Sequence, residues 1–342
     1  MLPSAASSSS AAIPLPLLIT GVTGVPGYNA LPYFQSRFPG KVFGLRQADS
    51  PMSGPGVLAC NAEDGDQLAR LFDRYQFAAV LNCAGNCALK PCELDPHLAW
   101  RINVEGVRNL LKLTVARRVR LVHLSVDLVF SGLRDGGYRE TDPTDPVTVY
   151  GKTMVVAEQE VLSADPTACV LRISLPMGVS FNGHAGAIDW IVSRFKKHRP
   201  ATLYFDEVRT PTFTDCMNEL YEAVLQRGLA GLFHAGGPRR LSLYEIAQII
   251  NRFGDFPPEL LMGIPRREAG PIPPRAGNVA MDSSRLTAAL GFEPFDPWPL
   301  DDAQMPTDRH WHRHRPPGEP RSLETLYSLL AVNHRRRLRK TG

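Results

Sequence analysis

LLITGVTGVPG, residues 17–27, joins an apolar run to three glycines spaced G-x-x-G-x-x-G and then leads into a helix. Glycine allows the backbone to turn tightly and to approach a pyrophosphate, whose charge the N–H groups of a helix N-terminus then stabilise. A glycine triplet alone is also explained by a purely structural turn. Its place between a strand and a helix favours a dinucleotide-binding site.

Beyond this unit, short β-rich runs alternate with segments that have the apolar spacing of a helix. The β-rich runs cover residues 17–20, 41–46, 78–85, 119–126 and 168–174. Helical spacing covers residues 68–75, 98–115, 150–162, 188–197, 242–253 and 323–332. This alternation predicts an α/β fold, a Rossmann-type doubly wound parallel sheet with a smaller C-terminal substrate lobe.

The chain is expected to divide into four parts, because its composition changes along its length. The first 14 residues, rich in Ser and Ala, are expected to form a flexible leader. The expected parts are a Rossmann domain of residues 15–176 and 205–236, a substrate-binding lobe of residues 177–204 and 237–308, and a basic tail of residues 309–342. Several prolines between Pro257 and Pro274 argue against regular structure there.

The charge is unevenly distributed and argues against a nucleic-acid-binding body. The 342 residues carry a net charge of +4, with 44% hydrophobic and 21% charged residues. Arg309 to Lys340 holds nine Lys/Arg against two Asp/Glu, so the remainder of the chain is mildly acidic. The terminal HRRRLRK either binds nucleic acid, anionic lipid or an acidic partner, or only increases solubility. No binding partner is assigned to it.

Cysteine usage and the N-terminus predict a cytoplasmic protein. Six cysteines are spread along a long chain without a small disulfide framework, which is typical of free thiols. The N-terminal stretch lacks the charged start of a secretory signal, and no apolar run reaches the roughly 20 residues of a membrane span. The spacing of Cys83, Cys87 and Cys92 does not match a zinc site. His310, His312 and His314 would share a face only in an extended chain, and a disordered tail is the favoured interpretation of this segment. No bound metal is therefore expected.

The residue at the end of the second strand selects the cofactor. Arg46 stands where an NAD-selective protein places Asp or Glu against the ribose hydroxyls. A guanidinium binds a 2′-phosphate through paired donors, which predicts NADP(H) rather than NAD(H). A solvated surface arginine is the alternative. Asn82 to Gly85 forms a floor of small residues beneath the cofactor, and Asn61 is placed near the adenine.

Six motifs occur in a fixed order, and together they resemble a known family. They are TGVTGVPG, LNCAGN, AWRINVEGVRNLL, HLSVDLVFSG, ETDPTDPVTVYGKT and VLRIS. The chain resembles the extended short-chain dehydrogenases/reductases, specifically the dTDP-4-dehydrorhamnose reductase branch, from about Leu17 to Leu290. The resemblance implies NAD(P)H-dependent reduction of a 4-keto group on a nucleotide-activated deoxysugar. One relative serves instead as a regulatory subunit of methionine adenosyltransferase.

The resemblance also implies a catalytic tyrosine, a lysine four residues later and a Ser/Thr hydroxyl before an Asp. The tyrosine is Tyr150, but Met154 and Val126 occupy the other two positions. Four residues along a helix share a face, so Lys152 lies on a different one. Ser125 is expected to point away from Val126 because neighbouring strand residues alternate. Lys152, Ser125 and Thr153 are the candidates that could take over the roles of the missing lysine and hydroxyl.

The resemblance therefore carries three alternatives: impaired or altered reductase activity, which is favoured, a fully active NADPH-dependent reductase, and a non-catalytic regulatory subunit. The expected cofactor contacts are Gly21, Thr23, Gly24, Pro26, Gly27, Arg46, Asn61, Asn82, Ala84, Gly85 and Tyr150. Arg209 and Thr212 are expected to face a nucleotide-activated sugar, with a lobe-joining turn as the alternative; Arg266, Arg267 and Arg275 either meet a diphosphate or are plain surface. A protein partner fits the regulatory alternative, and the oligomeric state stays open.

Overall fold

The computed structural model describes residues 12–333. Residues 1–11 of the expected leader and residues 334–342 of the expected basic tail lie outside the described residues. Ile13, at the start of the described chain, is buried against the main core rather than free in solvent. Packing of the chain therefore begins before the first strand.

A seven-stranded sheet forms the centre of the molecule, and all its neighbouring strands are parallel. Its spatial order is β11-β6-β5-β4-β1-β2-β3. The strands are β1 (Leu17–Thr20), β2 (Val42–Arg46), β3 (Val57–Ala59), β4 (Ala79–Asn82), β5 (Arg120–Val126), β6 (Cys169–Ile173) and β11 (Gly231–Ala235). Because the order reverses between β1 and β4, the loops after these strands open into the crevice where doubly wound sheets bind ligands. The predicted fold class is confirmed.

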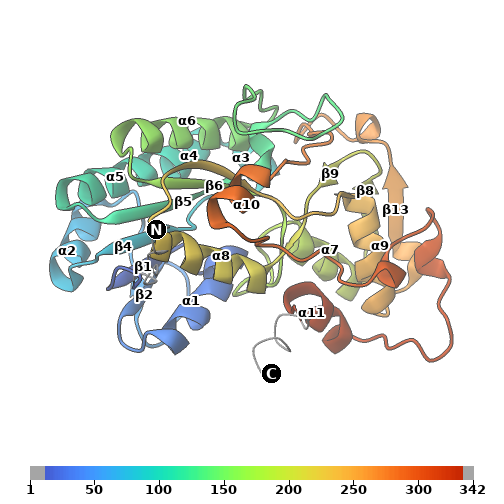
Figure 1. The fold of residues 1–342 in the computed structure, drawn as a ribbon. Helices are drawn as coiled ribbons and strands as arrows, with labels where there is room; N and C mark the ends of the chain where they lie inside the picture. The colour runs from blue at the N-terminus through green and yellow to red at the C-terminus, as the bar shows by residue number, and fades with distance from the viewer. Residues whose placement is uncertain (1–11, 334–342) are drawn as a thin grey trace, which may run out of the picture.

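Helices cover both faces of this sheet (Figure 1). On one face lie α2 (Gly65–Tyr75), α5 (Gly106–Arg117) and α6 (Val149–Ala164), whose apolar side chains form a core with β1, β4, β5 and β6. The other face carries α1 (Val25–Arg37) and α8 (Thr214–Arg227), which pack against each other. The short helices α3 (Leu89–Leu94) and α4 (Pro96–Trp100) precede a π-helical turn, Arg101–Glu105, that continues into α5.

Three two-stranded pairs lie outside the large sheet. They join β7 (Pro176–Met177) to β10 (Thr212–Phe213), β9 (Val208–Arg209) to β12 (Leu241–Ser242), and β8 (Ala201–Tyr204) to β13 (Leu261–Ile264). With them lie α7 (Ala187–Lys196), α9 (Leu243–Phe253) and α10 (Ser284–Leu290). In Figure 1, α7, α9, β8 and β13 group beside the carboxyl ends of the central strands, as expected for a smaller lobe.

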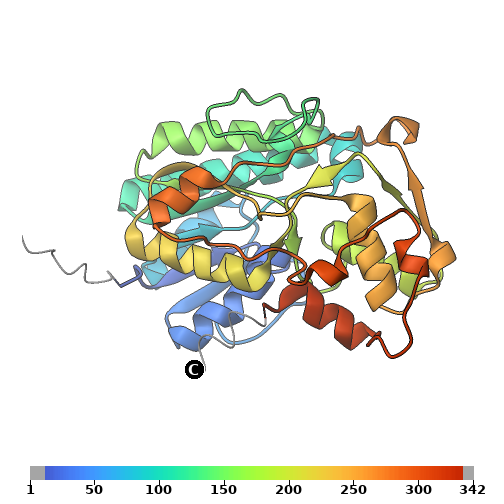
Figure 2. The same cartoon turned by 45° about the vertical axis from the view of Figure 1, so that its right-hand side comes forward.

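The C-terminal segment packs on this lobe, which corrects the expectation of a disordered tail for its described part. Figure 2 shows the red segment running along α9 and ending in α11 (Leu323–Ala331). Trp311 and His312 are buried, as are Leu326 and Leu330. Residues 309–333 are therefore part of the folded molecule.

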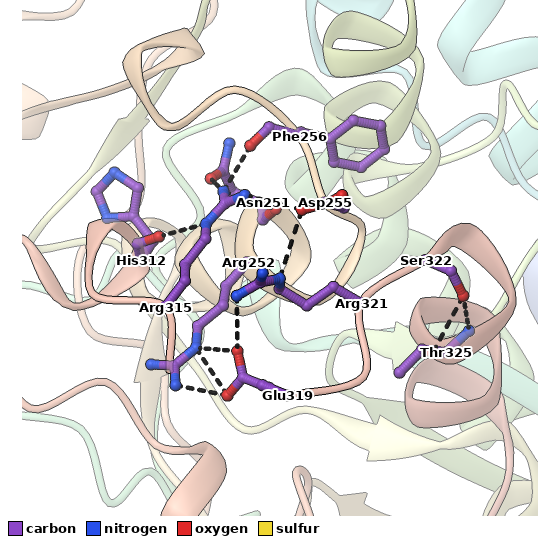
Figure 3. Close-up of polar contacts among 10 residues, drawn as sticks. All are labelled: Asn251, Arg252, Asp255, Phe256, His312, Arg315, Glu319, Arg321, Ser322 and Thr325. Carbon is purple, nitrogen blue, oxygen red and sulfur yellow. Dashed lines mark hydrogen bonds and ion pairs between the residues drawn. The ribbon is translucent and has the colours of Figure 1, made fainter. Parts of the chain in front are cut away.

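Ion pairs and hydrogen bonds, shown in Figure 3, and a cation–π contact fix this segment to α9. Arg252 pairs with Glu319 and lies 4.0 Å from the ring centre of Trp311. Arg315 donates to the side chain of Asn251, to the carbonyl of Phe256 and to Asp255. Arg315 thus satisfies acceptors at the end of α9, where helical carbonyls lack intrahelical partners. These contacts could not be predicted from the sequence, because the ion-paired residues lie 60 to 67 positions apart.

The described residues lack two kinds of feature, a membrane-spanning helix and a metal-binding cluster. Between residues 12 and 333, no helix combines the length and apolarity needed to cross a membrane. The same residues contain no group of three or more His, Cys, Asp or Glu side chains able to hold a metal ion.

Candidate functional site

The glycine-rich turn after β1 has the geometry of a close-packed cradle. Gly21 adopts a φ of +64°, and a Cβ there would lie 2.5 Å from the carbonyl oxygen of Cys83. At Gly27 a Cβ would lie 2.5 Å from the carbonyl oxygen of Gly21. The space above Gly24 is open, since a Cβ there meets only the Gly21 oxygen at 3.5 Å. The turn therefore presses α1 against β1 and leaves Gly24 accessible to a ligand.

A second segment lies directly beside this turn. The backbone N–H of Phe181 donates to the carbonyl of Thr23 at 3.1 Å. Asn29 on α1 donates to the carbonyl of Val179 at 3.0 Å. The chain that leaves β7 for the smaller lobe thus contacts the glycine-rich turn and the first helix. Both parts of the molecule meet at the expected cofactor position.

Arg46, at the end of β2, is hydrogen-bonded to its own loop and has a buried donor without a partner among the described residues. Its Nη1 donates to the carbonyls of Gln47 and Ala48 at 2.8 and 2.9 Å, while its Nε is buried and has no partner among the described residues. The Asn61 Oδ1 accepts from the N–H of Ala48 at 2.9 Å, so Arg46 and Asn61 hold the same loop. A buried donor without a partner is unfavourable unless a ligand satisfies it. The Arg46 Nε therefore has an unmet hydrogen bond at the end of β2.

Asn82 has an internal structural role at the carboxyl ends of the strands. Its Oδ1 accepts from the Thr20 hydroxyl at 2.5 Å, and its Nδ2 lies 2.9 Å from the His123 Nδ1. The N–H of Ala84 also contacts the Thr20 hydroxyl, at 3.2 Å. Burial lowers the pKa of His123 to about 4, so this histidine is neutral at physiological pH. The network joins β1, β4 and β5 and sets the path of the Ala84–Gly85 loop beneath the cofactor position.

The three positions implied for catalysis lie in one apolar cluster. Tyr150 and Met154 on α6 are buried there with Cys92, Phe130 and other apolar side chains, and Val126 packs against the same cluster. Burial raises the pKa of Tyr150 well above its ordinary value, with further raising contributions from the Cys87 thiol and the Asp127 carboxylate. The positive charge of Arg209 opposes this shift only partly. A phenol in this environment holds its proton tightly.

Of the three replacement candidates, Lys152 and Thr153 provide neither a cation nor a free hydroxyl next to Tyr150. Lys152 is exposed on the outer side of α6. Thr153 accepts a hydrogen bond from the Asn103 amide at 2.9 Å and donates to the carbonyl of Tyr150 at 2.7 Å, so its hydroxyl is already used. The Ser125 Oγ is buried and has no hydrogen-bond partner among the described residues. Ser125 is fully buried and Val126 partly buried, in line with their opposite orientations on β5.

Arg209 and Thr212 are buried rather than displayed on an open surface. Arg209 lies 3.3 Å from Asp127 and 2.7 Å from Glu207, so two carboxylates share its charge. The Thr212 hydroxyl lies 3.0 Å from the sulfur of Met217, and its side chain is fully buried. Arg209 is therefore held next to Asp127, the neighbour of Val126 in sequence, while Thr212 packs against Met217 of α8.

Of the three arginines suggested for a diphosphate, two contact other protein groups and one is exposed. Arg266 contacts Asp206 at 3.3 Å and donates to the carbonyl of Arg275, and Arg275 lies 3.7 Å from Glu207. Arg267 is exposed. These contacts place Arg266 and Arg275 beside the Arg209–Glu207 pair and leave Arg267 apart from it.

Two side chains that shape the site, those of Asn103 and Asp127, were not among the residues predicted from the sequence. Asn103 lies in the π-helical turn, where its Oδ1 accepts from the N–H of Asn86 at 2.7 Å and its amide reaches Thr153. Asp127 accepts from the Ser174 hydroxyl at 2.7 Å and pairs with Arg209. Both residues occur within quoted motifs, RINVEG and SVDLVF, but no spacing rule assigns their partners. π-Helical turns often occur at functional sites, so the turn that contains Asn103 is a structural indication of its role.

Known proteins share both the sequence and the fold. A family model described as "RmlD substrate binding domain" matches residues 16–305. The β subunit of methionine adenosyltransferase 2 from Danio rerio is 27% identical over 277 residues, covering 79% of this chain and 83% of that protein. A dTDP-4-dehydrorhamnose reductase from Aggregatibacter actinomycetemcomitans is 24% identical over 244 residues, covering 68% and 81%.

A solved structure shares the fold. The crystal structure of dTDP-4-dehydrorhamnose reductase from Bacillus anthracis, in complex with NADP, superposes with a TM-score of 0.70 at 18% identity. The match covers 82% of this chain and 95% of that one. The chain belongs to the RmlD substrate-binding domain family, in the dTDP-4-dehydrorhamnose reductase-like branch of the extended short-chain dehydrogenases/reductases.

Proposed function

We propose that this protein binds NADP(H) and a nucleotide-activated sugar but has impaired reductase activity. The observation that carries the proposal is the apolar cluster that contains Tyr150, Val126 and Met154, where the family places a proton donor, a hydroxyl and a cation. Binding is supported by the glycine cradle, and a preference for NADP(H) by the buried Arg46 Nε. In this proposal, residues 15–176 and 205–236 hold the cofactor and residues 177–204 and 237–308 face the sugar nucleotide.

The missing groups support proton transfer, and the lysine among them would also hold the nicotinamide ribose. When bound, NADPH supplies a hydride for reduction of a ketone. Tyr150 is the chain's own proton donor to the ketone oxygen, and its efficiency falls as its pKa rises away from the working pH. A lysine at position 154 lowers that pKa by stabilising the phenolate, whereas a methionine has no charge. Positioned acid–base groups typically contribute about 10²- to 10⁴-fold in rate, which sets the size of the expected loss.

Full activity, the first alternative, requires another cation to act on Tyr150. Arg209 is the basic group whose charge opposes the raised pKa of Tyr150. Its guanidinium is held by Asp127 and Glu207, which neutralise it within the buried site. Arg209 is therefore a weak substitute for a lysine in contact with the phenol.

The second candidate function is regulation of another enzyme. It is favoured by the 27% identical β subunit of methionine adenosyltransferase 2 together with the substituted catalytic positions. In this role, bound NADP(H) stabilises the folded form by mass action and so maintains a surface for a protein partner. Cofactor binding without turnover is common to both the impaired-enzyme and the regulatory roles.

Restoring the two family groups tests the proposal. Val126→Thr/Met154→Lys is expected to oxidise NADPH with dTDP-4-dehydrorhamnose at least about 100-fold faster than the unmodified chain, because proton transfer regains its support. Val126→Thr/Met154→Leu is the control, since it returns the hydroxyl but keeps an apolar side chain at position 154. Adding Tyr150→Phe to the restored variant is expected to abolish the gain.

Fluorescence titration with NADPH shows whether each variant retains a folded cofactor site. If the unmodified chain already turns over as fast as the restored variant, the impaired-activity proposal is wrong. If the restored variant binds NADPH but gains no rate, the substitutions are not the cause of any low activity.

A further inference from the structure

The first turn of α1 contains a proline at a position that otherwise supplies a hydrogen-bond donor. Gly24 is the N-cap of α1, so Val25, Pro26 and Gly27 occupy the first three helical positions. N–H groups at these positions have no acceptor within their own helix and are the groups that bind anions. Pro26 has no N–H. Only Val25 and Gly27 can donate from this turn.

The neighbouring N–H groups do not replace the missing donor. The N–H of Gly24 donates to the carbonyl of Gly21 at 3.0 Å, and that of Tyr28 donates to the carbonyl of Gly24 at 2.9 Å. The N–H of Phe181, beside the turn, is likewise used by Thr23. The glycine cradle thus has the shape of a pyrophosphate site but fewer donors than such a turn normally offers.

Side chains of the turn and of the first part of α1 provide no compensating charge. Residues 20–36 include no Lys or Arg, so α1 itself brings no cation to a diphosphate at its N-terminus. No acidic residue lies in the first turn of α1 either, so the positive end of the helix dipole is preserved. The loss is therefore specific to one hydrogen-bond donor. A fixed φ makes proline compatible with the helix start, which explains how α1 forms in spite of it.

We infer that Pro26 weakens the grip of this chain on the cofactor pyrophosphate and shifts recognition toward the adenosine 2′-phosphate end. The inference rests on the proposed NADP(H) binding. At the adenosine end the Arg46 Nε is buried and has no hydrogen-bond partner among the described residues, so a 2′-phosphate would supply the hydrogen bond that this charged group lacks. Pro26 acts as an affinity-determining residue and makes the 2′-phosphate contact more important for retaining the cofactor.

The test compares two prolines of the same helix. Pro26→Ala restores an N–H at the pyrophosphate position, whereas Pro32→Ala changes an exposed proline in the interior of α1 away from the turn. Each purified full chain is titrated with NADPH and with adenosine 2′-monophosphate, which lacks the diphosphate. Pro26→Ala is expected to bind NADPH about tenfold more tightly, the size of one charge-assisted hydrogen bond, with unchanged binding of adenosine 2′-monophosphate. Pro32→Ala is expected to leave both dissociation constants unchanged.

Two results contradict the inference, and they are distinguishable. If the unmodified chain and Pro26→Ala bind NADPH equally, the restored donor has no effect and the inference fails while the proposed function stands. If none of the three chains binds NADPH, the proposed function fails and the inference fails with it. NADPH binding by Pro26→Ala alone supports the inference, because the donor is then what the site lacks.

Discussion

At the scale of single residues, Arg46 is the side chain on which cofactor choice depends. Replacing Arg46 with Ala removes the guanidinium that the 2′-phosphate requires, so the dissociation constant for NADPH is expected to rise about tenfold or more while that for NADH stays the same. Arg74→Ala, at an exposed position on α2, is the matched control. Fluorescence titration with both cofactors checks this. An equal loss of NADH affinity would show that Arg46 only supports the loop through its contacts with Gln47 and Ala48.

A buried histidine in the C-terminal segment makes stability depend on pH. Burial lowers the pKa of His312 to about 4, below its value of about 6.5 in an unfolded chain. The unfolded state therefore binds a proton before the native state does, and this contribution to stability is complete above pH 6.5 and is lost as the pH falls toward 4. One such group changes the free energy of unfolding by about 1.4 kcal/mol per pH unit within that window.

Replacement of this histidine is expected to flatten the pH dependence. In chemical denaturation between pH 7 and 4.5, His312→Asn loses less stability per pH unit than the unmodified chain. His310→Asn, two residues away and exposed, keeps the original slope. Identical slopes for all three chains would contradict the assignment of His312 as a neutral buried group.

At the scale of secondary-structure elements, the attachment of the C-terminal segment to α9 depends on the Arg252–Glu319 pair. Glu319→Ala leaves the guanidinium of Arg252, which is 6% exposed, without its carboxylate partner. The cost of breaking a buried pair is about 3–5 kcal/mol, and partial exposure of Glu319 reduces the expected loss to about 2–3 kcal/mol. Urea denaturation measures it. Glu324→Ala, exposed in the first turn of α11, is expected to cost about 0.5 kcal/mol. Equal losses for the two variants would show that the pair does not anchor the segment.

The predicted elements can be recognised from their own residues, whereas the elements that were missed depend on contacts with distant parts of the chain. The central strands β1, β4, β5 and β6 are apolar runs between turns, as parallel strands buried on both faces require. β11, with the sequence GLFHA, was not predicted, because two of its five residues are Gly and His and its pairing with β6 is non-local. The segment RHWHRHRPPGEPR has a polar composition, yet its folding depends on α9, about 60 residues earlier.

The candidate site divides in the same way. Motif spacing located Tyr150, Val126 and Met154, and the structure brings them into one cluster. The pairing of Arg209 with Asp127 joins residues 82 positions apart and could not be derived from spacing. Motif order therefore located the positions that the family resemblance implies, while their partners and surroundings required the fold.

At the scale of the whole molecule, the proposed cofactor site and the proposed reaction site differ in how many of the family's groups they contain. In the proposed function, the seven-stranded sheet, the glycine-rich turn and Arg46 form a dinucleotide site, while the apolar cluster around Tyr150 lacks the groups that support proton transfer. Such a molecule is expected to gain stability from its cofactor: NADPH at 100 times its dissociation constant raises the free energy of unfolding by about 2.7 kcal/mol. A thermal shift with NADPH, larger than that with NADH, measures this coupling. An equal shift with both cofactors would count against selection for the 2′-phosphate.

The most direct test of the account follows NADPH that is bound to the unmodified chain. The protein is saturated with NADPH, as monitored by fluorescence, and dTDP-4-dehydrorhamnose is added while absorbance reports NADPH oxidation. The account predicts saturable binding and a rate at least about 100-fold below that of Val126→Thr/Met154→Lys under the same conditions. Failure to bind NADPH, or oxidation by the unmodified chain at the rate of that variant, would contradict it.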